Sequence, residues 1–183
     1  MERRTTSIEL REPRIEDAAA YLRLLARLPT DTPNFLFGYT PDLSIAAYVT
    51  RLQSMKHARN LPKGWVPATF LFAFDTTTNE IVGRASIRHA LNEQLAREGG
   101  HIGYAVLPKF RNQRIATQIL RLALDNARMQ LNIEDPLVTC DETNTASRRV
   151  IEKNGGIYEG KVDMPNGPPK LHFRFGAKTV PAM

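Results

Sequence analysis

Val106-Leu-Pro-Lys-Phe-Arg-Asn-Gln-Arg-Ile-Ala-Thr117 is the segment from which most of this chain's architecture can be inferred. Its first residues are typical of the end of a strand, Pro108 indicates a turn, and the remainder enters a long amphipathic helix. The free N–H groups at a helix N-terminus bind phosphate groups, and here Arg111 and Arg114 add positive charge beside them. The segment therefore predicts a pyrophosphate site.

The helix that follows this loop has the clearest periodicity in the sequence. Its polar residues, among them Gln118 and Arg121, lie outside a stripe of apolar residues at helical spacing. The stripe consists of Ile115, Ile119, Leu120, Ala123, Leu124, Ala127 and Leu131. This pattern predicts a long helix that packs one face against a sheet.

Weaker patterns surround this helix on both sides. Period-two alternation and turn residues predict strands at 8–13, 69–74, 81–88, 101–107, 136–141, 157–164 and 171–175. Helical spacing predicts further helices at 15–28, 41–59 and 144–153, with an aromatic loop at 30–40 and a polar connection at 91–100. The order predicts one α+β domain over residues 1–183, with a single-layer mixed, mostly antiparallel central sheet flanked by helices.

Composition narrows the class of protein. The chain has 183 residues, of which 42% are apolar and 24% charged, as expected of a globular domain with a sizeable core. No apolar run is long enough to span a membrane, and the N-terminus lacks the apolar core of a signal peptide. The single cysteine, Cys140, fits a reducing compartment and is typical of core packing. We therefore expect a cytoplasmic protein without membrane contact.

Histidine spacing indicates whether the chain has a metal site, and net charge indicates whether it could bind nucleic acid. The four histidines are scattered and show no paired spacing, so we expect no metal site. The net charge of +6 is compatible with a phosphate or nucleic-acid partner, and salt-sensitive nucleic-acid binding would support the second. No aromatic-interleaved Lys/Arg block is present, however, so the pattern favours a solvated basic surface over nucleic-acid binding.

Two blocks together resemble a known family. They are Arg111-Asn-Gln-Arg-Ile-Ala116 before the long helix, and Asn144-Thr-Ala-Ser147 opening a helix that ends at Glu152-Lys-Asn-Gly-Gly156. In this order and at this distance they resemble the GNAT superfamily of N-acetyltransferases, over about residues 69–160. Arg111 and Ala116 match the family's loop pattern, whereas Arg114 replaces its first glycine. The segments Arg88–Asn92 and Gly99–Tyr104 resemble a subgroup of mostly predicted acetyltransferases.

The resemblance implies an acyl-CoA-dependent N-acyltransferase. Such an enzyme would move the acetyl group of acetyl-CoA to an amine acceptor, a small molecule or a peptide, by direct attack in a ternary complex. A homodimer is compatible with the resemblance. The alternative is a non-catalytic CoA-binding or sensory module, because Ile151 and Gly100 stand where the family's general acid and base are expected.

The resemblance also implies where coenzyme A would bind. The loop and helix start would hold the pyrophosphate, through Arg111, Asn112, Gln113, Arg114, Ile115, Ala116 and Thr117. Val106 would bind the pantetheine arm through its backbone, and an N–H near Ala105 or Val106 would polarise the thioester carbonyl. Asn144 and Ser147 would line the far side of the pantetheine channel, although Asn144 is equally typical of a helix N-cap.

Three residues are candidates for catalysis: Glu98, His101 and Tyr104. Strand alternation places Tyr104 on the face of Gly100, Ile102 and Val106, where it could line the acceptor site, and His101 on the opposite face with Gly103 and Ala105. The pKa of histidine suits a base, but a hydrogen-bonded structural role fits His101 better. Glu98 could reach the site or remain in solvent.

The weakness of these candidates favours an acceptor that needs little help from a base. At pH 7 a lysine-like amine costs about 4 to 5 kcal/mol to deprotonate, whereas an α-amine costs about 1 kcal/mol. An α-amine is therefore the more compatible acceptor. Arg88 and Asn92 could bind an acidic group of the acceptor, with salt bridging and loop capping equally open.

Overall fold

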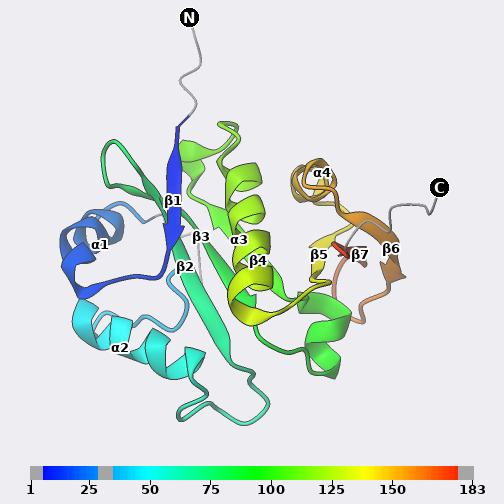
Figure 1. Cartoon of the computed structure of the whole chain (residues 1–183), viewed down its shortest axis with the longest axis horizontal. Coiled ribbons are helices and arrows are strands. Elements are labelled where there is room, and N and C mark those ends of the chain that lie inside the picture. Colours follow the sequence, from blue (N-terminus) through cyan, green and yellow to red (C-terminus); the bar gives the residue numbers. More distant parts are fainter. Residues whose placement is uncertain (1–5, 29–34, 177–183) are drawn as a thin grey trace, which may run out of the picture.

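The computed structural model describes residues 6–28 and 35–176 (Figure 1). Its strands are β1 (Ile8–Arg11), β2 (Ala68–Asp75), β3 (Ile81–Arg88), β4 (Ile102–Val106), β5 (Leu137–Asp141), β6 (Ile157–Val162) and β7 (Lys170–Arg174). Its α-helices are α1 (Ala18–Leu25), α2 (Ile45–Lys56), α3 (Ile115–Leu131) and α4 (Thr145–Lys153). Short helical turns are η1 (Ile15–Asp17), η2 (Leu95–Gly99) and η3 (Pro108–Phe110).

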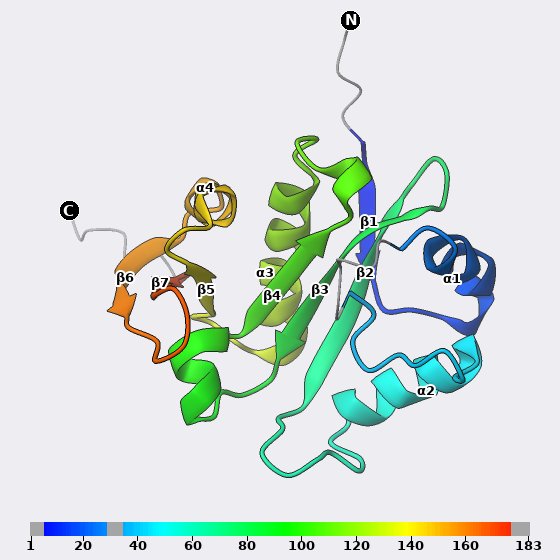
Figure 2. The same cartoon turned by 180° about the vertical axis from the view of Figure 1, so that it is seen from behind.

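The strands form two sheets. Strands β1, β2, β3 and β4 make an N-terminal sheet in that order, and a C-terminal sheet has the order β5, β7, β6. All pairings between these strands are antiparallel. Figures 1 and 2 show the C-terminal sheet beside β4, with α4 above it. The α+β class with a mostly antiparallel sheet is confirmed, but the layer is hydrogen-bonded as two sheets because β4 and β5 touch only at one end.

Helices cover both faces of the N-terminal sheet. Helix α3 contacts β1, β3 and β4 on one face, while α1 and α2 pack on the other (Figure 2). Each face has its own core. The core under α3 contains the predicted apolar stripe, of which Ile115, Ile119, Leu120, Ala123, Leu124 and Ala127 are buried. The core under α1 and α2 is aromatic and contains Tyr21, Tyr48, Phe70, Phe72 and Phe74.

Local chemistry explains where the elements differ from the sequence prediction. The helix predicted from Pro41 begins at Ile45, because the Ser44 hydroxyl accepts the Ala47 N–H at 3.2 Å and caps it. The predicted polar connection at 91–100 contains the π-helical turn η2. Residues 30–34 of the predicted aromatic loop lie outside the described part of the chain.

Residues 6–28 and 35–176 contain neither a membrane-spanning helix nor a cluster of metal-binding side chains. No helix there is long and apolar enough to cross a bilayer. The same residues contain no group of three His, Cys, Asp or Glu side chains that could hold a metal ion.

Replacing Ile115 by aspartate should disrupt the fold. Ile115 is only 1% exposed in the core under α3, and a carboxylate buried there should lower the free energy of unfolding by about 4 kcal/mol or more. Arg121→Asp, at an exposed position of the same helix, is the control and should cost less than about 1 kcal/mol. Thermal denaturation followed by circular dichroism measures both, and an unchanged melting temperature for Ile115→Asp would contradict this packing.

Candidate functional site

The loop before α3 presents an uncapped helix N-terminus. Arg114 is the N-cap residue, with φ 61° and ψ 8°, and no side chain caps the helix. Asn112 is also left-handed, with φ 62°. A non-glycine residue with left-handed backbone angles costs about 1 to 2 kcal/mol of folding free energy. The loop is therefore destabilised by adopting a backbone shape that favours glycine. The backbone thus takes the conformation expected of a glycine loop, and the first N–H groups of α3 remain available to an anion.

The outer edge of β4 has free backbone groups. The N–H of Leu107 donates to the Val82 carbonyl, and the His101 carbonyl accepts the Arg88 N–H, so these residues face β3. In an antiparallel ladder successive residues alternate. Val106 therefore presents its N–H and carbonyl at the open edge, whereas those of Ala105 point toward β3. Within the described part of the chain, the Val106 carbonyl accepts only one long hydrogen bond, 3.4 Å from Arg111 Nε.

Tyr104 and Ser147 meet across the space between the two sheets. The Tyr104 hydroxyl lies 2.8 Å from Ser147 Oγ and donates at 3.3 Å to the Ser147 carbonyl. Burial raises the pKa of Tyr104 to about 12, a rise that the hydrogen bond with Ser147 opposes. The phenol is therefore protonated at neutral pH and can donate a proton, but it cannot serve as a base.

The start of α4 faces the same region. Asn144 caps this helix, because its Oδ1 accepts the Ser147 N–H at 3.0 Å. The prediction that Asn144 is a helix N-cap is thus confirmed. The side-chain NH2 of Asn144 makes no hydrogen bond with the described residues. Further along the helix, Ile151 is fully buried in the core under α3. No hydroxyl is available at that position to protonate a leaving group.

His101 joins the two sheets. Its ring Nδ1 accepts the Leu137 N–H at 2.9 Å, and the backbone N–H of His101 donates to the Leu137 carbonyl at 2.6 Å. Burial is the main cause that lowers the pKa of His101, and Arg174 adds to the effect. The ring is therefore neutral, with its proton on Nε2, and its one basic nitrogen is already bound.

Glu98 lies on η2, away from the Tyr104–Ser147 contact. Its carboxylate accepts a hydrogen bond from Gln94 Nε2 at 2.6 Å, and its carbonyl accepts the Thr139 hydroxyl at 2.9 Å. The side chain borders a shallow pocket formed with Met164 and Pro165 of the β6–β7 turn. Glu98, His101 and Tyr104 therefore do not form one catalytic cluster.

A cavity of about 520 Å³ lies on the opposite face of the N-terminal sheet. Arg84, Ser86 and Arg88 of β3 form part of its floor, and Phe37, Trp65 and Phe70 contribute aromatic surface. Arg88 Nη1 donates to the carbonyls of Gly99 and Gly100, at 3.1 and 3.0 Å. Asn92 caps η2 and donates to the Gly64 carbonyl, so loop capping accounts for its polar atoms.

The sequence reasoning singled out Arg88 in this cavity but missed Arg84. The available signal was the alternation Arg84-Ala-Ser86-Ile-Arg88 within a strand otherwise buried on both faces. Charged residues are almost never fully buried without a partner. Arg84 is half-buried with its Nε out of contact with water, and periodicity does not show which groups its guanidinium contacts.

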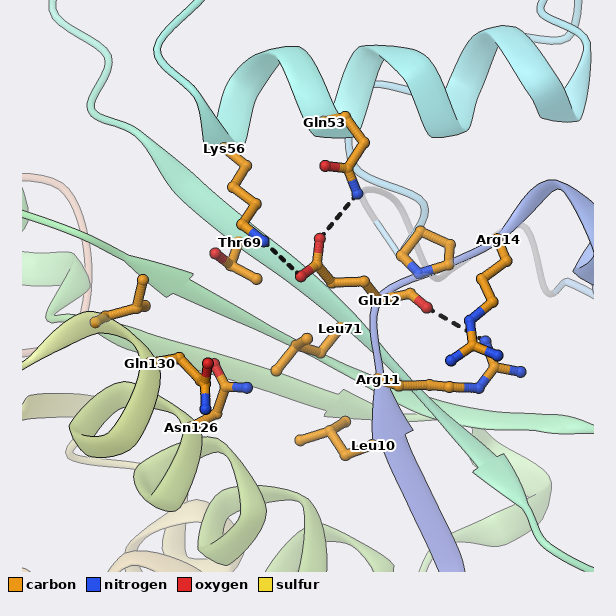
Figure 3. Close-up of a pocket in the computed structure, with 12 residues that line it drawn as sticks. Leu10, Arg11, Glu12, Arg14, Gln53, Lys56, Thr69, Leu71, Asn126 and Gln130 are labelled. Atoms are coloured by element: carbon orange, nitrogen blue, oxygen red, sulfur yellow. Dashed lines mark hydrogen bonds and ion pairs between the residues drawn. The ribbon is translucent and has the colours of Figure 1, made fainter.

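A larger cavity, of about 580 Å³, lies at the end of β1 near the C-terminal part of α3 (Figure 3). Carboxylates pair with two of its three cationic side chains, Arg11 and Lys56, and the third, Arg14, makes no ion pair with the described residues. Glu12 accepts hydrogen bonds from Lys56 Nζ at 2.7 Å and Gln53 Nε2 at 2.9 Å (Figure 3). Arg11 pairs with the buried carboxylate of Asp17 at 2.7 and 2.8 Å. Size alone therefore does not identify a ligand site, because carboxylates already pair with two of the cations at this cavity.

These features fit the implied cofactor. The uncapped start of α3, with Arg111 and Arg114, suits a pyrophosphate, and the free edge of β4 suits an extended amide-containing arm. The structure brings together β4, the α3 loop and the start of α4. It leaves Glu98 outside this arrangement.

The chain matches the family model described as an acetyltransferase (GNAT) domain over residues 7–157. None of the curated proteins matches it significantly. A similar solved structure is the ribosomal-protein-S5-alanine acetyltransferase from Vibrio fischeri, with 17% identity, a TM-score of 0.64 and 94% of each chain covered. A GNAT-family acetyltransferase from Bacillus anthracis has 18% identity and a TM-score of 0.62, covering 96% of this chain and 98% of its own.

The ribosomal L7/L12 α-N-protein acetyltransferase RimL, solved in complex with coenzyme A, is also similar. Its identity is 19% and its TM-score 0.60, with 93% of this chain and 94% of RimL covered. At such identities the structural likeness shows a common fold, and the family model supplies the activity because it spans most of the sequence. The chain belongs to the GNAT acetyltransferase family and is an acetyltransferase that uses acetyl-CoA.

Proposed function

We propose that this protein transfers the acetyl group of acetyl-CoA to the α-amine of a peptide or small molecule by direct attack in a ternary complex. The observation that carries the proposal is the open edge of β4 leading directly into the uncapped N-terminus of α3. Two solved relatives are described as acetyltransferases of ribosomal proteins, and their descriptions name an alanine and an α-N position. This supports an N-terminal amine as one class of acceptor.

We assign the binding of coenzyme A to three groups of residues. The N–H groups from Gln113 to Thr117 bind the pyrophosphate, with charge from Arg111 and Arg114 and with Asn112 shaping the loop. The outward N–H of Val106 pairs with the pantetheine arm or the thioester carbonyl, a role that the inward N–H of Ala105 cannot fill. The free NH2 of Asn144 faces the arm from the start of α4.

Acetyl-CoA supplies an activated acetyl group and a thiol leaving group. Tyr104 holds a proton beside Ser147, at the point where the two sheets separate, and is the proton donor that we assign. Little assistance is required, because a thiol of pKa ~8.5 leaves as thiolate at pH 7 with a deficit of about 2 kcal/mol. No described side chain at this point is a free base, so the acceptor amine must lose its proton to water or enter neutral.

Assembly and location are separate predictions. A homodimer stays a prediction; the exposed apolar side chains of Ile157 and Tyr158 on β6 are compatible with one. A cytoplasmic location is proposed from the single cysteine. Sedimentation of the purified protein would determine the oligomeric state.

A panel of amines tests the transferase activity directly. The protein is mixed with acetyl-CoA and each acceptor, and release of free thiol is followed together with calorimetric binding of CoA. We expect turnover with α-amines to exceed that with lysine-like amines, because deprotonation costs about 3 to 4 kcal/mol less. Tight CoA binding with no turnover on any amine would favour a non-catalytic CoA-binding module instead.

Reversing the charge of Arg114 should weaken CoA binding. Arg114→Glu places a carboxylate at the pyrophosphate and should raise the Kd for CoA by about 10-fold or more, since a charge-assisted hydrogen bond is worth 1.5 to 3 kcal/mol. Arg59→Glu makes the same charge change at an exposed position beyond α2 and serves as the control. Equal Kd values for the two variants in calorimetry would exclude this placement of the phosphates.

Removing the Tyr104 hydroxyl should slow turnover modestly. For Tyr104→Phe we expect kcat to fall by at most about 30-fold at pH 7, the limit set by the thiolate deficit of about 2 kcal/mol. The loss should shrink as the pH rises toward the thiol pKa, and the KM for acetyl-CoA should change little. Tyr158→Phe, at an exposed position of β6, is the matched control. A kcat unchanged at every pH would remove Tyr104 from the mechanism.

A further inference from the structure

The cavity of about 520 Å³ on the α1 and α2 face of the N-terminal sheet carries positive charge that no carboxylate in its described lining balances. Arg84 and Arg88 both line it, and its described lining includes no aspartate or glutamate. The Nε of Arg84 is buried and has no hydrogen-bond partner among the described residues. A buried cation without a counter-ion is costly, so its presence calls for a ligand that supplies negative charge.

Both guanidinium groups are largely withdrawn from water. Burial is the main cause that lowers the pKa of Arg84 and of Arg88, and for Arg84 the nearby Arg88 adds to the effect. The Cζ of Arg84 lies 5.9 Å from the centroid of the Phe35 ring, which is a weak cation–π contact. Arg88 uses Nη1 to hold the carbonyls of Gly99 and Gly100, and its Nε and Nη2 make no hydrogen bond with the described residues.

The cavity at the end of β1 shows the opposite arrangement. There Lys56 and Arg11 have the carboxylates of Glu12 and Asp17 within 2.7 Å. Figure 3 shows Glu12 pointing between Gln53 and Lys56 and filling the role of the anion. Two of the cations at the end of β1 are thus paired with carboxylates, whereas the cavity around Arg84 and Arg88 has no carboxylate in its described lining.

The unbalanced cavity reaches the strand where the chemistry is proposed. Gly103 of β4 pairs with Ser86 of β3, and a Cβ at Gly103 would lie 3.8 Å from Arg88 Nη1 and 3.3 Å from Ser86 Oγ. The Arg88 guanidinium therefore lies close to β4, and the tightest contact that a Cβ at Gly103 would make is with Ser86 Oγ. Gly103 is about 10 Å along the strand from Val106, given the rise of a β-strand. This is the opposite end of β4 from the pyrophosphate loop.

We propose that the acceptor is an amine that carries a carboxylate, and that Arg84, assisted by the free N–H groups of Arg88, binds this carboxylate in the cavity. The proposal rests on the proposed acetyl transfer, since it names the acceptor class of the same site. Phe37, Trp65 and Phe70 provide aromatic surface for an apolar portion of the acceptor. The cavity volume of about 520 Å³ suits an amino acid or the first residues of a peptide.

The same charges would help the reaction in the absence of a base. A cation near an ammonium group lowers the pKa of that group, because the two like charges repel. By pairing with the acceptor's carboxylate, the guanidinium groups offset the tendency of that carboxylate to hold the proton on the ammonium group. The reaction balances as the transfer of an acetyl group to nitrogen: the ammonium loses one proton to water before attack, and the nitrogen loses a second as the amide forms. Tyr104 protonates the thiolate and regains its proton from that second one through water.

Binding can be tested without turnover, because Trp65 is the only tryptophan in the chain and lines the cavity. Fluorescence of Trp65 is titrated with phenylalanine and with phenylalanine amide, which differ by the carboxylate. A second pair, the dipeptide amides Asp-Phe and Asn-Phe, tests a carboxylate borne by a peptide. We expect the acid of at least one pair to bind about 10-fold to 100-fold more tightly than its amide. The pair that discriminates identifies the source of the carboxylate.

Arg84→Met removes the charge and keeps an unbranched apolar side chain. It should abolish the discrimination between acid and amide, while Arg84→Lys should retain part of it and Arg59→Met should retain all of it. The unliganded Arg84→Met protein should be at least as stable as the wild type, since a desolvated cation is removed. Its melting temperature should no longer rise when the carboxylate ligand is added.

The outcomes separate the two proposals. Preference for the carboxylate in fluorescence with no acetylation of any amine would retain the anion subsite and refute the transferase mechanism. Acetylation of amides at rates equal to the matching acids, with kcat/KM for both falling equally in Arg84→Met, would refute the carboxylate proposal and retain the transferase. Equal affinity for acid and amide in both pairs would also overturn the carboxylate proposal.

Discussion

The junction of His101 with Leu137 is the contact on which the site depends. Two hydrogen bonds, of 2.6 and 2.9 Å, join β4 to β5 at this point, and pairing between these strands stops there. Gly100 permits the close approach, because it has φ 62° and a Cβ would lie 2.6 Å from the Leu137 carbonyl. Beyond this junction the outward backbone groups of Tyr104 and Val106 have no strand partner, and they form the edge along which acetyl-CoA is proposed to lie.

The two faces of the N-terminal sheet carry different parts of the proposed site. One face carries α3, whose apolar stripe holds the helix in place and leaves its N-terminus free for phosphate. The other face carries the aromatic core and, in its cavity, Arg84 and Arg88. β4 lies between these features, with Tyr104 and Val106 on the first face and Gly103 and Ala105 on the second. A cofactor and an acceptor bound as proposed would therefore meet at one strand from opposite sides.

Much of the fold was predictable because burial imposes a period on the sequence. The stripe from Ile115 to Leu131 and the alternation in β4 specify their faces directly, and both are confirmed by the burial of Ile115 and Ile102. Other features depend on contacts between distant segments. Two hydrogen bonds, from Leu137 to His101 and between Tyr104 and Ser147, join residues that no sequence spacing relates. Sequence spacing also does not show that Arg84 Nε has no hydrogen-bond partner among the described residues. In the sequence, the only sign of the left-handed backbone at Arg114 was that this residue replaces a glycine of the family's loop pattern.

The sequence by itself determined the family, the α+β class and the loop from Val106 to Thr117, because local periodicity and a short motif encode a strand, a turn and a helix start. Tertiary structure alone decided which groups are free. The Val106 N–H is free because none of the described strands pairs with β4 beyond the His101–Leu137 junction; His101 is not free because Leu137 occupies its basic nitrogen. Arg84 is unbalanced because packing brought it no carboxylate among the described residues. Hydrogen-bond partners and counter-charges are set by residues far apart in the chain, so no local pattern records them.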